Sequence, residues 1–252
     1  MDRREFLIAS GTLAATLSIP VVAAEHKPIS LPFKAVLFDG FPIFDPRSVF
    51  KMALQFFPEK GNELVKEWRT RQFEYTWLRS LAGNYADFFK VTEDALIFAS
   101  QLLGINISLL QQKQLMDAYY HLQTWPEVPA ALARMKAGGL RLGILSNYTP
   151  EMLTVNTANN HIDGYFEHLI SVDRVKKYKP DPATYALGMS IFNLPKEDIL
   201  FVPFAGWDAA GSKTFGYQTY WVNGLQQPLE QLGTKPDGIG KTLNDLLAYL
   251  HL

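Results

Sequence analysis

The sequence predicts an α/β fold in which a parallel sheet carries a helical cap inserted after the first strand. Residues 34–38 (KAVLF) form a short apolar run between turn residues, which suits a buried parallel strand. Residues 49–120 then show helical spacing of apolar side chains with almost no strand-like alternation. Beyond residue 128, apolar runs that suit strands alternate with helical patterns, and this order is typical of a parallel sheet.

The position of each element follows from the spacing of its apolar residues. In the cap, Trp68, Phe73, Trp77 and Leu81 recur at helical spacing. The later strands are expected at residues 140–145, 168–172, 199–202 and 218–222. The helices of this part are expected at residues 128–136, 150–157, 182–192, 208–215 and 243–250. A cap domain of residues 47–120 is therefore expected to interrupt a core domain made of residues 25–46 and 121–252.

The first 24 residues have the pattern of an export signal. Arg3 and Arg4 precede a moderately apolar stretch that ends in small residues, and R-R-x-F-L resembles a twin-arginine signal. We therefore expect a signal peptide at residues 1–24, a passage through the twin-arginine export machinery and a periplasmic protein. An uncleaved membrane anchor facing the periplasm, which Pro20 argues against, and a chain that stays in the cytoplasm are the alternatives.

Composition excludes several classes of function. The 252 residues are 48% hydrophobic and 19% charged, which is typical of a globular protein. The formal net charge of -1 provides no basic field for nucleic acid. The chain has no cysteine, so disulfides, thiolate nucleophiles and cysteine–metal sites are excluded. Its five histidines are scattered without zinc-site spacing, so no metal is expected.

Polar residues follow the predicted strands at the sheet edge where parallel α/β folds bind ligands. Asp39 closes the first strand, directly before the cap, and a carboxylate there is placed to act as a covalent nucleophile. The alternative role for this residue is a turn former ahead of Gly40.

Three further strand ends carry candidate residues. Ser146 and Asn147 close the next strand, just before a helix that Thr149 is expected to cap, and helix N-termini bind anions. Lys179 precedes a stiff Pro-Asp-Pro segment and can hold an ammonium against a carboxylate. Asp208 begins a helix and can pair with Lys179 or orient water. Alternatively, Ser146 and Asn147 only shape a turn, Lys179 is a solvated lysine, and Asp208 is an acid that stabilises the helix dipole.

From about Lys34 to the last helix, the chain resembles the haloacid dehalogenase superfamily, and within it the type II L-2-haloacid dehalogenases. The resemblance lies in the cap segment at residues 68–96 (WRTRQFEYTWLRSLAGNYADFFKVTEDAL) and in LSNYTPEML. It continues through SVDRVKKYKPDPATYAL and ILFVPFAGWDAAGSKTFGYQTYWVN. It implies the superfamily's Rossmann-like parallel core with a helical cap, and a homodimer.

The resemblance also implies a reaction and roles for single residues. A first-motif aspartate, here Asp39, attacks C2 of an L-2-haloacid and displaces halide. Water then hydrolyses the ester to the D-2-hydroxy acid without a metal or cofactor. Arg69 stabilises the leaving halide, Lys179 balances the charge beside Asp39, and Asp208 fixes Lys179 and the hydrolytic water. The implied substrate-binding and wall residues are Ser146, Asn147, Phe41, Phe88, Tyr185 and Trp207.

The active-site loops depart from the family pattern. The segment from Asp39 to Asp45 (DGFPIFD) is one residue shorter than the family loop and lacks its Gly-Thr. Pro203 and Ala205 stand where the family carries a serine and an asparagine. Losing one such donor costs about 10²–10³ in rate. Three hypotheses therefore remain: a dehalogenase with lowered or altered activity, an Asp39-dependent hydrolase of other small acids or esters, and a non-catalytic protein.

Two other readings of the motifs are disfavoured. A superfamily phosphatase needs an acid two residues after the nucleophile, where this chain has Phe41, and another acid in the region of Phe204. With so few carboxylates, magnesium-assisted phosphoryl transfer has little support. The segment GIGKT at residues 238–242 ends like a phosphate-binding loop, but Lys235 replaces the required glycine, so a turn is expected there.

Overall fold

The computed structural model describes residues 32–252, and the predicted signal peptide at residues 1–24 lies outside them. Its centre is a six-stranded sheet in the order β5-β4-β1-β6-β7-β8, in which every neighbouring pair is parallel. The strands are β1 (Ala35–Phe38), β4 (Arg141–Ser146), β5 (His168–Ser171), β6 (Ile199–Val202), β7 (Gln218–Val222) and β8 (Gly238–Gly240). The parallel α/β fold predicted from the sequence is confirmed.

Strand β1 lies in the middle of the sheet and is buried on both faces. All four of its residues are fully buried, which explains why AVLF at residues 35–38 is a continuous apolar run. Phe38 pairs with Ile144 of β4 on one side and with Val202 of β6 on the other. The carboxyl ends of β4, β1 and β6 therefore meet at one edge, and the loops that follow them come together there.

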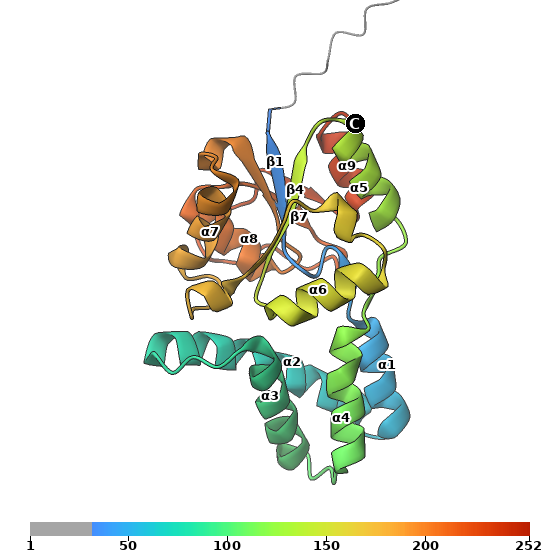
Figure 1. Cartoon of the computed structure of the whole chain (residues 1–252). Coiled ribbons are helices and arrows are strands. Elements are labelled where there is room, and N and C mark those ends of the chain that lie inside the picture. The colour runs from blue at the N-terminus through green and yellow to red at the C-terminus, as the bar shows by residue number, and fades with distance from the viewer. Residues whose placement is uncertain (1–31) are drawn as a thin grey trace, which may run out of the picture. The chain divides into compact units, whose positions relative to one another are not determined.

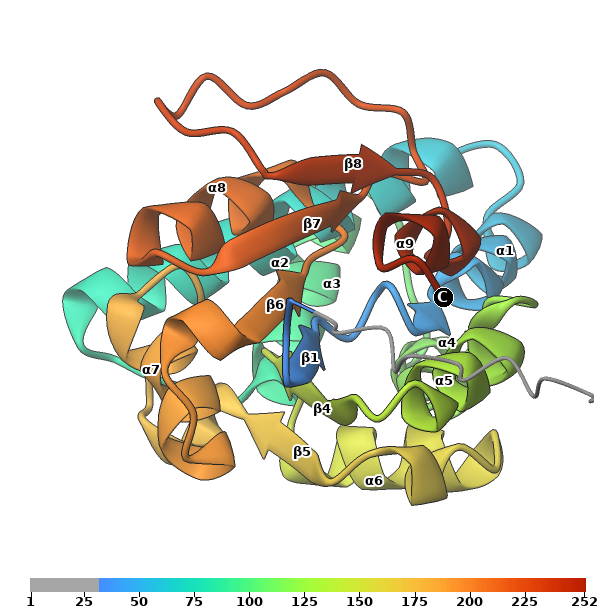
Figure 2. The same ribbon diagram turned by 90° about the horizontal axis from the view of Figure 1, so that it is seen from above.

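Helices cover both faces of this sheet. Figure 2 shows α7 (Pro182–Phe192) and α8 (Gly206–Phe215) on one side, and α5 (Val128–Ala137) and α9 (Leu243–Tyr249) on the other. Helix α6 (Pro150–Asn159) begins as expected, because the Thr149 hydroxyl accepts a hydrogen bond from the Met152 backbone N–H and Pro150 occupies the first turn. Each of these helices lies within two residues of its predicted bounds.

The segment between β2 (Phe44–Asp45) and β3 (Gln123–Thr124) consists of helices joined by loops and contains no strand. It contains α1 (Arg47–Phe56), α2 (Gly61–Ala82), α3 (Phe88–Leu102) and α4 (Leu109–Asp117), which Figure 1 shows grouped at the carboxyl edge of the sheet. Inside this group the indole of Trp68 is fully buried and donates to the Thr92 carbonyl over 2.8 Å. No helix within residues 32–252 is long and apolar enough to cross a membrane.

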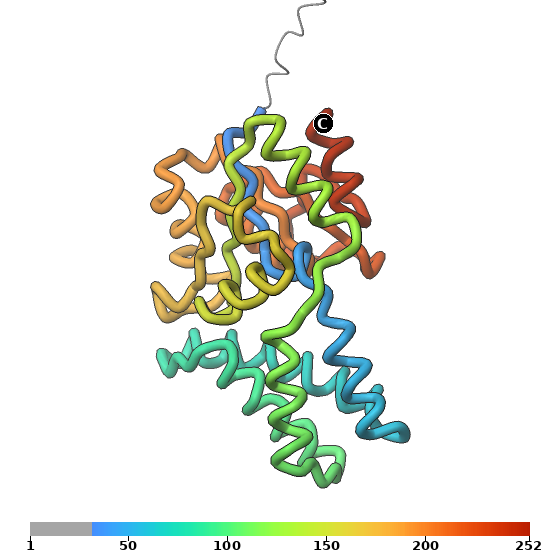
Figure 3. Tube along the Cα trace, turned by 45° about the vertical axis from the view of Figure 1, so that its right-hand side comes forward, coloured from blue at the N-terminus to red at the C-terminus, as the bar shows by residue number. Residues whose placement is uncertain are grey.

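The two chain segments that join the helices to the sheet run beside each other. Strand β2 (Phe44–Asp45) pairs antiparallel with β3 (Gln123–Thr124), and Figure 3 shows the blue and green segments passing side by side. Residues 32–252 form one compact unit. The cap boundaries at residues 47 and 120 therefore stay a prediction.

One expected turn is a strand. Residues 238–240 of the GIGKT segment form β8, which pairs with the outer edge of β7. Glycine is needed in this strand because an added Cβ at Gly240 would lie 2.1 Å from the Tyr220 hydroxyl. The prediction was wrong because a glycine-rich strand has no side-chain alternation that a sequence pattern can detect.

Candidate active site

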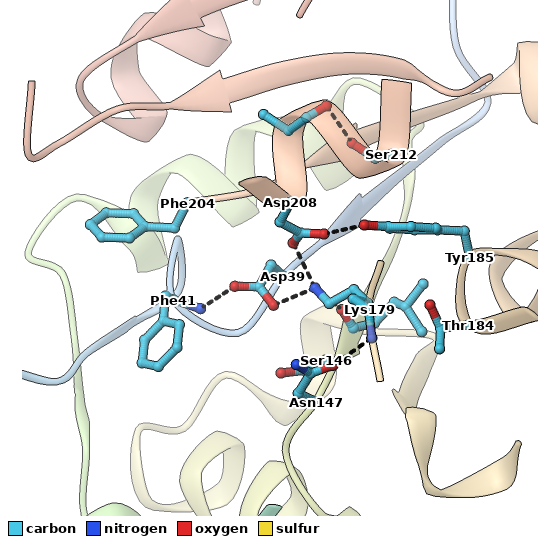
Figure 4. A network of polar contacts seen from close by, with 12 residues as sticks. Asp39, Phe41, Ser146, Asn147, Lys179, Thr184, Tyr185, Phe204, Asp208 and Ser212 are labelled. Carbon is cyan, nitrogen blue, oxygen red and sulfur yellow. Dashed lines mark hydrogen bonds and ion pairs between the residues drawn. The ribbon is translucent and has the colours of Figure 1, made fainter. Parts of the chain in front are cut away.

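Asp39 lies at the carboxyl end of β1, where the strand order places it between two other strand ends. Its backbone N–H donates to the Val202 carbonyl of β6 over 3.0 Å, which extends the sheet pairing to this residue. Its Oδ1 accepts a hydrogen bond from Lys179 Nζ at 2.6 Å, and its Oδ2 accepts one from the Phe41 backbone N–H at 3.2 Å (Figure 4). The residue is 7% exposed, so this carboxylate is almost desolvated and held at both oxygens.

Lys179 is the centre of the polar network. The residue is 1% exposed, and its ammonium also donates to Asp208 Oδ2 at 2.7 Å and to the Leu145 carbonyl at 3.3 Å. Burial lowers the pKa of Lys179, but the charges of Asp208 and Asp39 outweigh it and leave that pKa above its usual value. The side chain is therefore a charged ammonium that holds both carboxylates.

Asp208 lies in the first turn of α8 and is 1% exposed. Its second oxygen, Oδ1, accepts a hydrogen bond from the Tyr185 hydroxyl at 2.6 Å. Burial, together with the charge of Asp39, raises the pKa of Asp208 to about 6 although Lys179 opposes the shift. Both oxygens are occupied by the protein, so the geometry makes Asp208 the residue that positions Lys179.

A small cavity of about 10 Å³ lies beside Asp39, which is about the space that one water molecule needs. Six of its lining residues belong to the predicted site, namely Asp39, Phe41, Phe88, Ser146, Asn147 and Trp207. Three more residues line it that were not predicted to bind substrate, namely Phe73, Tyr148 and Ala205. Cap and core both contribute walls, so the reacting atoms would be shielded from water.

The structure places Tyr185 behind the cavity instead of in its wall. The sequence assigns this residue to substrate binding, yet it does not line the cavity, and its hydroxyl is used by Asp208. The fully buried ring packs edge-on against Phe201 in the core. Its position is that of a support for the Lys179–Asp208 pair, because the start of α7 turns it toward α8.

Arg69 on α2 lies next to the cavity. Its guanidinium carbon is 5.5 Å from the ring centre of Phe41 and 5.6 Å from that of Phe73, and both rings line the cavity. Among residues 32–252 no carboxylate forms an ion pair with it, and its Nη1 is buried without a hydrogen-bond partner. Burial lowers the pKa of Arg69. A desolvated guanidinium without a counter-ion favours the binding of an anion.

The loop after β4 supplies the neutral polar groups. Asn147 accepts a hydrogen bond from the Lys179 backbone N–H at 3.3 Å through Oδ1, so its amide N–H groups remain for the cavity. The Ser146 hydroxyl lies so near the first loop that an added Cβ at Gly40 would be 2.9 Å from it. Gly40 therefore allows the loops after β1 and β4 to approach closely.

The two departures in the loop after β6 have clear consequences. Ala205 precedes α8 without any side-chain cap and presents only its methyl group to the cavity. The Phe204 ring stacks on Trp125 with 5.9 Å between ring centres, and the Pro203 carbonyl accepts from the Val222 backbone N–H over 3.0 Å. This wall is therefore apolar, with no side chain that accepts or donates a proton.

Known proteins are similar to this chain in sequence. The family model for haloacid dehalogenase-like hydrolases matches residues 11–216. An (S)-2-haloacid dehalogenase of Pseudomonas sp. (strain YL) is 40% identical over 205 residues, which cover 81% of this chain and 88% of the relative. The haloacetate dehalogenase H-2 of Moraxella sp. (strain B) is 38% identical over 205 residues, which cover 81% and 92%.

Solved structures agree with these sequence relatives. An L-2-haloacid dehalogenase structure superposes with a TM-score of 0.86 at 40% identity and covers 87% of this chain and 99% of its own. The L-2-haloacid dehalogenase of Xanthobacter autotrophicus with chloropropionic acid covalently bound gives a TM-score of 0.80 at 31% identity, with 86% and 98% covered. The chain therefore belongs to the haloacid dehalogenase-like hydrolases.

Proposed function

We propose that this chain hydrolyses small L-2-haloacids to D-2-hydroxy acids through a covalent ester on Asp39. The observation that carries the proposal is the joint placement of two charged groups around one small apolar cavity. On one side Asp39 is held by Lys179 at 2.6 Å, and on the other the Nη1 atom of the half-buried Arg69 is sealed from solvent without a hydrogen-bond partner. The sequence relatives named as haloacid dehalogenases support the substrate class.

In the first step the Asp39 carboxylate attacks C2 of the haloacid. A carbon–oxygen bond forms, the carbon–halogen bond breaks, and its electron pair leaves with the halide. Arg69 stabilises the charge that develops on the leaving halide. The amide of Asn147 and the loop after β4 orient the substrate carboxylate, while the rings of Phe41 and Phe88 exclude water from the nucleophile.

In the second step water adds to the carbonyl carbon of the Asp39 ester. Negative charge develops on the oxygen held by Lys179, and the ammonium at 2.6 Å stabilises it. The bond between the Asp39 acyl carbon and the oxygen of the hydroxy acid then breaks. The hydroxy acid takes one proton of the added water, and the second proton passes to solvent as the Asp39 carboxylate is regenerated. Asp208 keeps Lys179 in place through both steps.

Halide release tests this function. The purified chain from residue 25 to 252 is assayed with L-2-chloropropionate and bromoacetate, beside Asp39→Asn and the control Asp45→Asn. Asp45 is an acid of the same loop, but its carboxylate pairs with Arg47 at 2.6 Å, away from Lys179. Release by wild type and by the control, with none by Asp39→Asn, is the expected result. No release from a folded wild-type sample would refute the dehalogenase proposal.

We also propose that residues 1–24 direct export of the protein to the periplasm. The support is the Arg3-Arg4 pair before a moderately apolar stretch. A reporter fused after Ala24 should appear in the periplasm, and replacing both arginines with lysine should keep it in the cytoplasm. A reporter that stays bound to the membrane would favour an anchor. A homodimer is likewise a proposal, which light scattering of the purified chain tests.

A further inference from the structure

The Tyr148 hydroxyl is a polar group that the reaction described above does not use. Tyr148 follows Asn147 directly, is 1% exposed and lines the cavity beside Asp39. Its hydroxyl oxygen is sealed from solvent and has no hydrogen-bond partner. A buried hydroxyl without a partner destabilises a fold, so a bound ligand that accepts a hydrogen bond from it would remove this penalty.

The ring is held firmly at the cavity wall. It packs edge-on against Phe41 with 5.4 Å between ring centres, and it packs at a tilt against Phe88 with 5.5 Å between ring centres. Its backbone is fixed as well, because the Ser171 hydroxyl donates to the Tyr148 carbonyl at 2.6 Å and the Tyr148 N–H donates to Ser146 Oγ at 3.2 Å. The hydroxyl is therefore a preorganised group, which is the kind that stabilises charge most effectively in a transition state.

The charges around Tyr148 determine what it can bind. Burial, followed by the effects of Tyr119 and of the negative charge of Asp39, raises the pKa of Tyr148 well above its usual value although Arg69 opposes the shift. The hydroxyl therefore stays protonated and can donate. Arg69 also lies against the Phe41 ring, with its guanidinium carbon 5.5 Å from the ring centre, and its buried Nη1 is a second donor without a partner. Two unpartnered donors beside one cavity favour an anionic acceptor.

We propose that the Tyr148 hydroxyl and Arg69 Nη1 together bind the halide as it leaves C2. This inference rests on the proposed function and adds a residue to it. As Asp39 forms its bond to C2, the electron pair of the carbon–halogen bond leaves with the halide, which accepts one hydrogen bond from each donor. No proton leaves Tyr148 in this step. The hydrogen bond from Tyr148 compensates in part for the missing polar side chains of the loop that contains Pro203 and Ala205.

Tyr148→Phe isolates the hydroxyl, because it keeps the ring that packs on Phe41 and Phe88. We expect kcat to fall by about 10- to 100-fold, the usual effect of a hydrogen bond to a charged group, with little change in KM. The loss should be greater with chloroacetate than with iodoacetate, because chloride is smaller and its charge comes closer to the hydroxyl. Tyr220→Phe is the matched control, since that tyrosine is buried in β7, away from the cavity.

Binding of bromide to the resting enzyme provides a readout that does not depend on turnover. Bromide is titrated calorimetrically into wild type, Tyr148→Phe and Tyr220→Phe, and thermal unfolding checks that each variant is folded. About tenfold weaker binding in Tyr148→Phe alone is expected. Equal bromide affinity and equal kcat in Tyr148→Phe and wild type would overturn the inference. If wild type binds bromide through Tyr148 but releases no halide from haloacids, the halide-binding site exists, but the proposed function and the role of Tyr148 in halide departure both fail.

Discussion

Replacing Lys179 with methionine removes the ammonium that lies between Asp39 and Asp208 while keeping a side chain of similar length. Both contacts are short, at 2.6 and 2.7 Å, and Lys179 and Asp208 are each 1% exposed. Removing one partner of such a buried group destabilises a fold by about 3–5 kcal/mol, because the remaining charge is left uncompensated. We therefore expect Lys179→Met to lose about 3–5 kcal/mol of unfolding free energy at pH 7, together with its activity.

The pH dependence of this loss distinguishes the electrostatic cause from lost packing. Asp208 already has a pKa of about 6, because burial and Asp39 raise it against the opposing effect of Lys179, so removing Lys179 raises that pKa further. An acid whose pKa is higher in the folded than in the unfolded protein stabilises the fold at pH values below its unfolded-state pKa. This stabilisation is lost as the pH rises toward the folded-state pKa. The difference between variant and wild type should therefore grow by roughly 1.4 kcal/mol per pH unit between pH 6 and 8.

Urea unfolding at pH 6, 7 and 8 measures both the loss of unfolding free energy in Lys179→Met and the change of that loss with pH. The control is Lys34→Met, which breaks an exposed ion pair with Asp198 and should change stability by less than about 1 kcal/mol at every pH. A loss in Lys179→Met no larger than in Lys34→Met would refute the reasoning. So would a loss that shrinks as pH rises from 6 to 8.

Three further predictions follow from single contacts. Because the pKa of Asp208 is about 6, kcat/KM should fall below that pH as protonation removes the charge that holds Lys179. The Asp208→Asn variant should not show this fall at low pH. An unchanged pH profile in the variant would contradict the role of Asp208 in holding Lys179. Gly40→Ala should lower kcat/KM by about 10²-fold, since its Cβ would lie 2.9 Å from Ser146 Oγ, and wild-type kinetics would argue against a tight loop. Tyr85→Phe removes a hydrogen bond from the cap to Asp173 and should lower unfolding free energy by about 1 kcal/mol in urea, whereas unaltered stability would show that the contact is not formed.

The fold could be predicted because its strongest signals are local. AVLF at residues 35–38 is apolar throughout because β1 is covered on both faces, and the capping sequence Thr149-Pro150 marks the start of α6. The resemblance to the family implies that Lys179 balances the charge beside Asp39. In the structure the Lys179 ammonium lies 2.6 Å from Asp39 Oδ1.

The parts that were not predicted depend on partners far away in the sequence. Tyr148 reads as an ordinary loop residue, and its unpartnered hydroxyl becomes visible only when Phe41 and Phe88 pack against it from two other segments. Its signal in the sequence was only its position directly after Asn147. Tyr185 lies on the right helix but faces Asp208, because the angle at which α7 meets α8 is a tertiary property.

The covalent ester on Asp39 is the central claim, and oxygen transfer in a single turnover tests it most directly. Excess wild-type enzyme reacts with L-2-chloropropionate in water labelled with heavy oxygen, and mass spectrometry follows the label in the peptide that contains Asp39 and in the product. We expect the label in Asp39 and unlabelled lactate, because the product oxygen comes from the carboxylate in the first turnover. Labelled lactate with unlabelled Asp39 would show that water attacks the substrate directly and would contradict the account.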